Sequence, residues 1–422
     1  MSPRPPPAHR ATTAHLRAVY PFAAAGRTAA SGTYVGREVL GGPFFHDPWE
    51  LYRAGLLTNP NLVVAGQIGR GKSTFVKTFV WRQLAYGRQA WIVDPKGEYG
   101  PLAEAAGCRP VHLSPGGSVR LNPLEQAPAS SVDDPVRHPV ELCCAIAESG
   151  LARPLSPAER TATDLAVRSA ARSDLPSVIE KLFQPDREMA AAVRTGVADL
   201  AADGRSVALE LRRLVHGDLA GMFDASVSSA AAFEGPVVVL DLSSLYDSPA
   251  LGVLITCAVA WLHGLLRRRD PVKRLVVVDE AWAVLHDIAT ARWLQSSFKL
   301  SRAFGVANVA VIHRLSDLSA AGDRASAQRL LAEGLLADSE SRVIFGQSPA
   351  EIDTARAALA LTATEARLIQ RLPRGIALWK VGERSSLVEL VVGPSERRLV
   401  DTDAAMRPAG DRALAPAAGE PR

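Results

Sequence analysis

A glycine-rich stretch early in the chain has the residue types and spacing of a phosphate-binding loop. It reads GQIGRGKST over residues 66–74, follows the apolar run LVVA and precedes a helix-forming stretch. Glycines let backbone N–H groups turn inward around phosphate oxygens, and the helix directs its positive end at the same group. We predict that the Lys72 ammonium binds the β- and γ-phosphates and that the Ser73 hydroxyl completes a Mg²⁺ shell. The predicted cradle comprises Gly66, Gln67, Ile68, Gly69, Arg70, Gly71, Lys72, Ser73 and Thr74.

An acidic pair later in the chain supplies the second half of such a site. Four apolar residues, 275–278, predict a buried strand that ends at Asp279 and Glu280. Ligands of open α/β sheets gather at the carboxyl ends of the strands. A hydrolytic phosphate site needs one carboxylate for the metal and a second group to activate water. We predict that Asp279 binds Mg²⁺ through water and that Glu280 is the general base.

Three charged residues follow another predicted strand. Asp94, Lys96 and Glu98 lie directly after the apolar run 90–93. Because charged residues just past a parallel strand lie on the ligand edge of the sheet, we predict that these three flank the nucleotide. A solvated turn is the alternative interpretation of the same residues.

The elements that must position these residues follow an α/β pattern. Short β-branched runs recur with helix-forming stretches between most of them, which is typical of a mostly parallel sheet flanked by helices. The runs are 61–65, 90–94, 236–241, 274–279, 306–312, 342–345 and 376–381.

The chain divides into five predicted segments. Residues 122–233 are rich in Ala, Leu, Arg and Glu, carry helix-start signals and show no convincing strand, so we predict an all-helical insertion. It interrupts an ATPase core whose first part is 31–121 and whose second part is 234–402. The Pro-, Ala- and Arg-rich ends, 1–30 and 403–422, are predicted to be disordered tails.

Composition is that of an ordinary intracellular globular protein. Of 422 residues, 47% are hydrophobic and 22% charged, which excludes a wholly disordered, collagenous or coiled-coil chain. The four cysteines have no CxxC spacing, which argues against a disulfide framework or a zinc ribbon. The first residues lack the apolar stretch of a signal peptide. We therefore expect a reducing cytosol.

Charge and hydropathy give no sign of a nucleic-acid patch or a membrane span. Seven of the 48 basic residues are lysines and 41 are arginines, but the net charge is only +4 and the one tight basic run is 267–269. Residues 248–266 carry no Asp, Glu, Lys or Arg, yet they contain proline and glycines and lie between two predicted strands. We predict a buried helix there.

The motifs together resemble a known family. The segments WIVDPKGEY (91–99) and VVDEAW (277–282) resemble those of type IV secretion and conjugation ATPases of the TraC/TrbE kind, within the HerA/FtsK superfamily of RecA-like motors. The tripeptide Asn122-Pro123-Leu124 and the run PVVVLDL (236–242), which bound the helical insertion, are similar too. The resemblance covers about residues 33–402 and implies a RecA-like fold.

The resemblance also implies roles for further residues. Relatives place a γ-phosphate-sensing glutamine where this chain has His313, which either takes over that role through a ring N–H or is structural. Arg302, Arg314 and Arg342 are candidates for an arginine finger that enters a neighbouring subunit's site. Trp282 and Trp379 are expected to pack in the core.

The implied function is ATP hydrolysis by a ring motor that powers conjugative DNA transfer or type IV-like secretion. The implied partners are other copies in a hexameric ring, membrane-embedded channel subunits, and DNA as an optional transferred substrate. The location is cytoplasmic, with peripheral attachment to the inner face of the membrane as an option. Only about 60 residues precede the phosphate loop, so the large amino-terminal docking domain of many relatives is expected to be absent.

Two alternatives remain open at this stage. The first is a HerA- or FtsK-like translocase that threads duplex DNA through the ring; it would need a basic pore. The second is a nucleotide-gated assembly scaffold without useful turnover, which the replacement of the sensor glutamine by His313 motivates and the intact Glu280 opposes.

Overall fold

One mixed sheet organises the protein. The structure is a computed structural model that describes residues 32–39, 41–125, 136–225, 235–248, 250–266, 272–285, 288–301, 304–313, 334, 336 and 339–401. Within these residues the sheet has eleven strands. They are β1 Thr33–Glu38, β2 Pro43–His46, β3 Leu62–Ala65, β4 Gln89–Asp94, β5 Val111–His112, β6 Val237–Asp241, β7 Arg274–Val278, β8 Val306–Ile312, β9 Ser341–Phe345, β10 Ile376–Val381 and β11 Arg384–Leu390.

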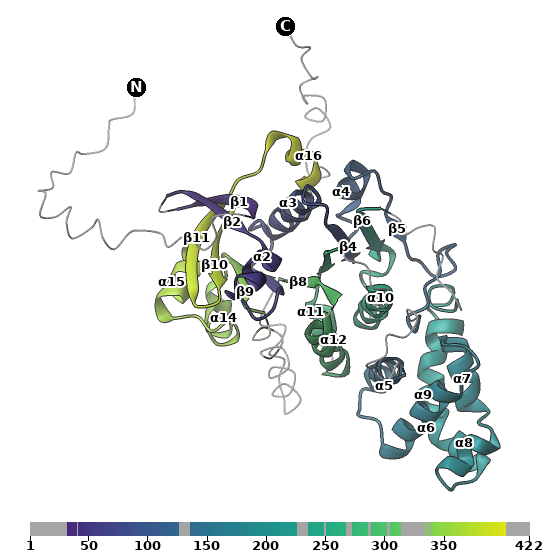
Figure 1. Cartoon of the computed structure of the whole chain (residues 1–422). Coiled ribbons are helices and arrows are strands. Elements are labelled where there is room, and N and C mark those ends of the chain that lie inside the picture. The colour runs from purple at the N-terminus through teal and green to yellow at the C-terminus, as the bar shows by residue number, and fades with distance from the viewer. Residues whose placement is uncertain are drawn as a thin grey trace, which may run out of the picture.

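The strand order is β2-β1-β11-β10-β9-β3-β8-β7-β4-β6-β5. The strands from β9 to β5 are parallel to one another, whereas β10, β11, β1 and β2 extend the sheet in antiparallel fashion. Figure 1 shows β1 and β2, in purple, beside the yellow strand β11, so the two ends of the described chain meet in this extension. Only β8 separates β3 from β7.

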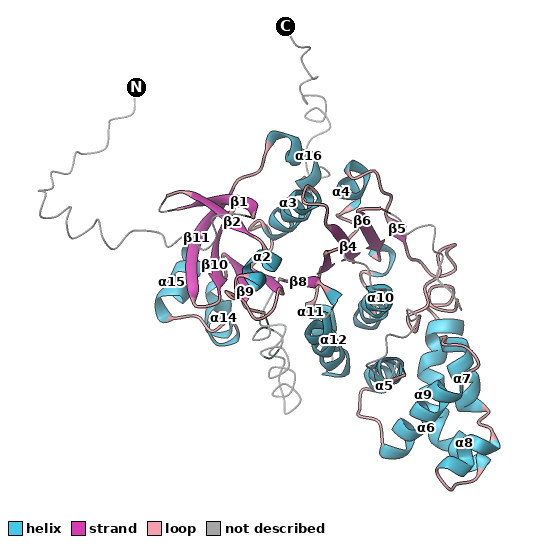
Figure 2. Ribbon diagram, in the orientation of Figure 1, coloured by secondary structure: helices cyan, strands magenta, loops and turns pink. Residues whose placement is uncertain are grey.

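Helices cover both faces of the sheet (Figure 2). One face is covered by α3 and α4 and the other by α10 and α12. The helices are α2 Pro48–Arg53, α3 Lys72–Leu84, α4 Gly100–Ala105, α5 Arg137–Leu151, α6 Pro157–Ser169, α7 Leu175–Phe183, α8 Arg187–Ala192, α9 Val197–His216, α10 Leu251–Leu266, α11 Trp282–Leu285, α12 Ile288–Ser301, α14 Ile352–Ala358, α15 Ala363–Arg371 and α16 Arg397–Val400.

The core lies on both faces of the parallel strands. In β3, Val63 and Ala65 belong to the hydrophobic cluster on the α10 side, whereas Leu62 and Val64 belong to the cluster that includes α3. All four side chains are buried. A strand covered by helices on both faces must be apolar at every position, and this is why β3, β6 and β7 read as continuous apolar runs.

The predicted α/β fold with a mostly parallel sheet is confirmed. All seven predicted strand runs appear, as β3, β4, β6, β7, β8, β9 and β10. The sequence did not reveal β1, β2, β5 and β11. β5 has two residues, and β1, β2 and β11 alternate or contain glycine, proline and serine, so none of the four is a continuous apolar run.

The described residues between β5 and β6 include five helices, α5–α9, and no strand. Ser156 begins α6 with a capping box in which its side chain accepts from the Glu159 N–H and Glu159 reaches back to the Ser156 N–H. Asp174 and Asp186 cap α7 and α8 in the simpler way. Within this group α5 packs on α12 of the core. The exact boundaries of the insertion, 122 and 233, stay a prediction.

The uncharged segment around α10 is a helix of the core. Its residues Leu254, Ala258 and Trp261 are fully buried. None of the described helices combines the length and apolarity needed to cross a membrane. The prediction of a buried helix over this segment is therefore confirmed.

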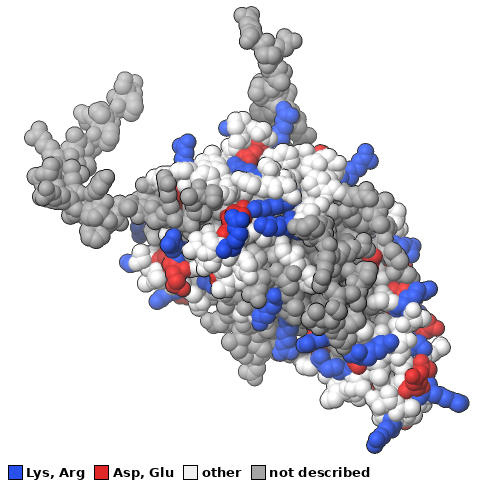
Figure 3. Space-filling view, viewed as in Figure 1, with Lys and Arg blue, Asp and Glu red and all other residues white. Residues whose placement is uncertain are grey.

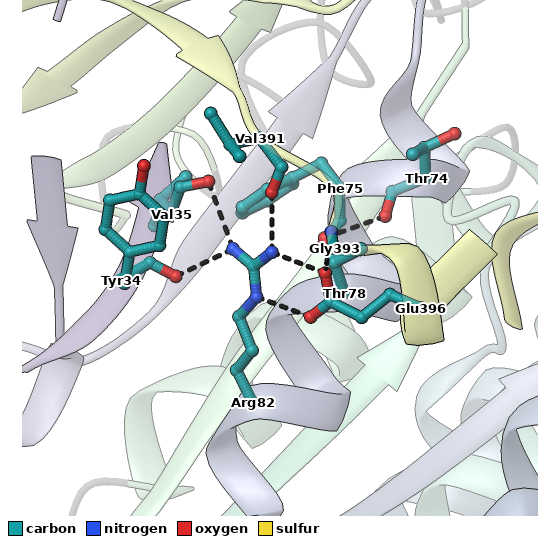
Figure 4. A network of polar contacts seen from close by, with 9 residues as sticks. All are labelled: Tyr34, Val35, Thr74, Phe75, Thr78, Arg82, Val391, Gly393 and Glu396. Carbon is teal, nitrogen blue, oxygen red and sulfur yellow. Dashed lines mark hydrogen bonds and ion pairs between the residues drawn. The ribbon is translucent and has the colours of Figure 1, made fainter. Parts of the chain in front are cut away.

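A polar network fixes the far end of α3 (Figure 4). The Arg82 guanidinium donates to both carboxylate oxygens of Glu396, each at 2.6 Å, and to the backbone oxygens of Tyr34 at 2.9 Å, Val35 at 3.1 Å and Val391 at 2.5 Å. The bonds join α3 to β1 and to the segment before α16. Because Arg82 and Glu396 are mostly buried, loss of one partner would leave the other charge without compensation.

An aromatic cluster packs between α3 and the antiparallel strands of the sheet. Trp379 lies 4.9 Å from Phe44, 5.2 Å from Phe75 and 5.0 Å from His46, measured between ring centroids. Trp379 is thus a packing residue, as predicted, whereas the Trp282 side chain lies outside the described residues. His46 is fully buried, and neither ring nitrogen has a hydrogen-bond partner among the described residues. Burial lowers the pKa of His46 from 6.5 to about 4.

Replacement of His46 by leucine should therefore make the protein less sensitive to acid. The unfolded chain takes up a proton at His46 near pH 6.5 and the folded protein only near pH 4, so this residue costs stability as the pH falls through that interval. The expected loss is about 3 kcal/mol by pH 4. Urea unfolding of wild type and His46→Leu at a series of pH values measures it, and parallel stability profiles would contradict the assignment.

Candidate functional site

The predicted phosphate loop follows β3 and is held by both neighbouring strands. The Gly66 N–H donates to Ile312 O at 3.3 Å, at the end of β8, and the Gln67 N–H donates to Gly346 O at 3.0 Å, just after β9. The loop then turns into α3, which begins at Lys72. The first amides of a helix have no acceptor within the helix. The loop therefore presents the start of α3 at the carboxyl edge of the sheet.

The loop's glycines meet specific backbone requirements. Gly69 and Gly71 have φ of 77° and 114°, in the left-handed region that side chains disfavour. Gly66 also has a positive φ, of 154°, and space is a second limit there, because a Cβ would lie 2.6 Å from Phe345 Cβ. Ile68, at the tip of the loop, is 64% exposed.

Lys72 is the buried cation of the loop. Its side chain is 3% exposed, and Nζ donates to the backbone oxygens of Gly66 and, at 2.9 Å, of Gln67. Burial lowers the pKa of Lys72 to about 8, although the charges of Asp279 and Glu280 oppose the shift. The next residues, Ser73 and Thr74, are partly buried in the first turn of α3. The Lys72 ammonium thus lies in the field of both predicted carboxylates.

Asp279 and Glu280 follow β7 in a sharp turn. Asp279 is 2% exposed and its N–H donates to Val93 O at 3.2 Å, on the neighbouring strand β4. Glu280 has a φ of 53°, unusual for a residue with a side chain, and its N–H donates to Asp279 Oδ1 at 2.9 Å. Burial, and then the charge of Glu280, raise the pKa of Asp279. Two carboxylates are thus held together in a buried position.

Two side chains, those of His313 and Lys96, contact the Glu280 carboxylate and stabilise its negative charge. His313, directly after β8, places Nε2 2.8 Å from Glu280 Oε1, and Lys96 Nζ forms an ion pair with the same oxygen. Burial alone would raise the pKa of Glu280, but the hydrogen bonds and charges of His313 and Lys96 outweigh it and hold the pKa at about 2. Glu280 is therefore ionised at neutral pH.

Asp279, Glu280 and His313 each offer one atom that could bind a metal ion, and these three atoms lie within 4.8 Å of one another. Buried carboxylate oxygens are the ligands that Mg²⁺ prefers. The residue types at this edge therefore fit a divalent cation, with the Ser73 hydroxyl in the first turn of α3.

The turn after β4 is shaped by Asp94. This carboxylate is fully buried and accepts from the Lys96 N–H at 3.2 Å and the Tyr99 N–H at 2.8 Å. Burial raises the pKa of Asp94 to about 6, although hydrogen bonds from the backbone of Tyr99 and Glu98 oppose the shift. The turn directs Lys96 to Glu280 and places Glu98 3.7 Å from Lys77 Nζ, measured to Oε2. Asp94 thus shapes the turn that the sequence predicted to flank a nucleotide.

Of the three predicted arginine candidates, Arg342 is the one that the described residues include. Arg302 and Arg314 lie outside the described residues. Arg342, on β9, donates to the backbone oxygens of Leu336 at 3.1 Å, Ser339 at 3.1 Å and Leu359 at 3.0 Å. Its guanidinium therefore joins segments of its own chain, and a role in a neighbouring site stays a prediction.

Sequence reasoning missed one buried cation of the site. Lys77 is 1% exposed and lies four residues after Ser73, on the same face of α3. The sequence signal was its i, i+4 spacing from Ser73, because residues so spaced share a helix face. Nothing in a single sequence shows that this face points inward.

The comparisons with known proteins identify similar structures and no similar sequence family. No protein-family model matches the chain, and no curated protein matches it. The structure of VirB4 of Thermoanaerobacter pseudethanolicus superposes with a TM-score of 0.71 at 19% identity, over 89% of this chain and 100% of that one.

The bacterial conjugative coupling protein TrwB is similar as well. Its complex with ADP and Mg²⁺ superposes with a TM-score of 0.58 at 16% identity, over 87% of this chain and 91% of that one. Its complex with the non-hydrolysable ATP analogue ADPNP gives 0.53 at 17% identity, over 79% and 85%. The chain has the fold of these proteins, and this agrees with the predicted RecA-like architecture.

The two glycines of the loop should differ in their tolerance of alanine. Gly66→Ala forces a Cβ against the buried Phe345 and should cost about 3 kcal/mol of unfolding free energy. Gly69→Ala meets no atom within 4 Å and should cost only about 1 kcal/mol, from its positive φ. Urea unfolding measures both losses. Equal losses would mean that the close approach of β9 to the loop is absent.

Proposed function

We propose that this protein is a P-loop ATPase that hydrolyses ATP with Mg²⁺ and drives conjugative transfer or type IV-like secretion. The observation that carries the proposal is the meeting of Lys72 with the buried pair Asp279 and Glu280 at one edge of the sheet. Burying two adjacent carboxylates costs free energy unless cations compensate them, and such arrangements cluster at functional sites. The similarity in fold to VirB4 and TrwB supports the transfer role.

The residues divide the catalytic work as follows. The Lys72 ammonium and the first amides of α3 bind the phosphate oxygens. The Ser73 hydroxyl and the Asp279 carboxylate are the groups that would hold Mg²⁺, which when bound neutralises charge on the transferred phosphoryl group. ATP and Mg²⁺ are the proposed ligands, and the TrwB complexes with ADP and Mg²⁺ and with ADPNP support the choice.

Glu280 has the position and charge of a general base. It is ionised, and a carboxylate at the end of β7 can take a proton from a water that attacks the γ-phosphate. His313 holds the carboxylate through Nε2 and keeps Nδ1 without a partner among the described residues. We therefore propose that His313 orients the base and that its ring senses the γ-phosphate.

The assembly we propose is a hexameric ring with sites at subunit interfaces, completed by an arginine of the next subunit: Arg302, Arg314 or Arg342. Membrane-embedded channel subunits are the proposed partners, and a cytoplasmic position at the inner face of the membrane follows from that role. On the face in Figure 3, basic and acidic side chains of the described residues are interspersed over the surface.

Purified protein should hydrolyse ATP in a Mg²⁺-dependent way. Lys72→Ala should abolish ATP binding, because the loop loses its cation. Glu280→Gln should keep ATP binding and lower kcat by about 10²- to 10⁴-fold, because the base is lost while the phosphate cradle remains. A phosphate-release assay and calorimetric titration with ATP measure the two effects, and activity should rise with protein concentration if neighbouring subunits complete the site.

Each other outcome favours another function. Strong stimulation by DNA with a steep salt dependence would favour the translocase. Tight ATP binding without turnover in the wild type would contradict the motor and leave the scaffold. Hydrolysis that persists in both variants would place the reaction elsewhere.

A further inference from the structure

Lys77 is a buried charged residue to which the proposed mechanism gives no role. It lies on α3 one turn beyond Ser73, and its side chain is 1% exposed. Lysine is rarely this buried. An ammonium group loses its hydration on burial, and this costs free energy unless charged partners compensate the loss. A lysine in this position therefore needs partners nearby.

Those partners come from the turn after β4. Lys77 Nζ is 3.7 Å from Glu98 Oε2 and 5.3 Å from the centroid of the Tyr99 ring, which is fully buried. Burial lowers the pKa of Lys77, and the negative charges of Glu98, Asp94 and Asp279 oppose the shift. The ammonium is thus held by a carboxylate, an aromatic face and the field of the acidic cluster.

The turn reaches two different elements through alternate residues. Glu98 contacts Lys77 of α3, whereas Lys96 pairs with Glu280 after β7. Between them Gly97, with a φ of 70°, packs so closely on Ser243 that a Cβ would lie 3.2 Å from the Ser243 Cβ. The turn is therefore fixed at both sides, and a shift of Glu98 would move Lys96.

The choice of lysine adds a second observation. The chain uses 41 arginines and only seven lysines, yet three of the seven lie in this one cluster: the buried Lys72 and Lys77 and the partly buried Lys96. An ammonium is a compact point charge, whereas a guanidinium is a wide planar fork. The cluster therefore uses lysine, the compact cation, in a chain whose other basic residues are mostly arginines.

We propose that Lys77 is a positioning residue of the ATPase site: through Glu98 it fixes the turn after β4 and so sets Lys96 against the base Glu280. This inference rests on the proposed function. Lys77 touches no reacting group itself, and its effect passes through Glu98, the turn and Lys96. Loss of the Lys77–Glu98 pair should thus impair the chemical step and leave the phosphate cradle intact.

The test compares three variants with a matched control. Lys77→Met keeps the length of the side chain without its charge, Glu98→Gln removes the partner's charge, and the third variant combines both. Lys181→Met is the control, since Lys181 pairs with Asp186 at 3.0 Å in the helical group, far from the cluster in the fold. Steady-state ATP hydrolysis gives kcat and KM, and calorimetry with Mg²⁺ and ADP gives nucleotide affinity.

Each single variant at the pair should lower kcat about tenfold, because the rate of the chemical step falls steeply when a catalytic group is displaced from its position. Affinity for ADP should change less than about threefold, since Lys72 and the loop are intact. The double variant should lose no more than either single variant, because the two side chains act as one unit. Lys181→Met should match the wild type.

Several results would overturn the inference. An unchanged kcat would mean that the pair does not position the base. Losses that multiply in the double variant, or an ADP affinity that falls in proportion to kcat, would indicate separate or purely structural roles. If Lys77→Met fails to fold, Glu98→Gln decides alone, because its side chain is 27% exposed. If Lys72→Ala hydrolyses ATP at the wild-type rate, both the proposed function and this inference are overturned.

Discussion

The structure depends on one electrostatic constraint: two adjacent carboxylates, Asp279 and Glu280, are buried side by side. Such a pair persists in charged form only if cations are held around it. Lys72 from the loop, Lys96 from the turn after β4 and His313 from the end of β8 supply that charge or its hydrogen bonds. The negative charge of the acidic pair is thus compensated by side chains from three separate elements.

The sheet order makes this balance possible. Parallel strands bring their carboxyl ends to one edge, and the order β3-β8-β7-β4 places the loop, His313, the acidic pair and the Asp94 turn next to one another. The antiparallel extension has another task. It packs against α3 through the aromatic cluster and the Arg82 network, so the helix that begins at Lys72 is fixed along its length. The same helix therefore stabilises both the proposed nucleotide site and the fold.

The sequence predicted what is local. The loop pattern and the apolar runs are short-range signals, and they predicted the parallel strands except the two-residue β5, together with β10 of the antiparallel extension. The strands β1, β2 and β11 escaped because none is a continuous apolar run, and β1 pairs with the distant β11 only in the fold. Lys77 and the carbonyl contacts of Arg342 escaped for the same reason: burial and partners of a charged side chain are tertiary facts. The interplay of Glu280 with Lys96 was likewise visible only in three dimensions.

The central claim is that Lys72, Ser73, Asp279 and Glu280 form a single ATPase site. A crystal structure of the protein with Mg²⁺, ADP and aluminium fluoride tests it most directly. The account predicts Mg²⁺ at about 2.1 Å from Ser73 Oγ, with Asp279 beside it and Glu280 facing the attacking water. A nucleotide bound elsewhere, or Mg²⁺ held without Ser73 and with Glu280 turned away from the phosphoryl analogue, would contradict it.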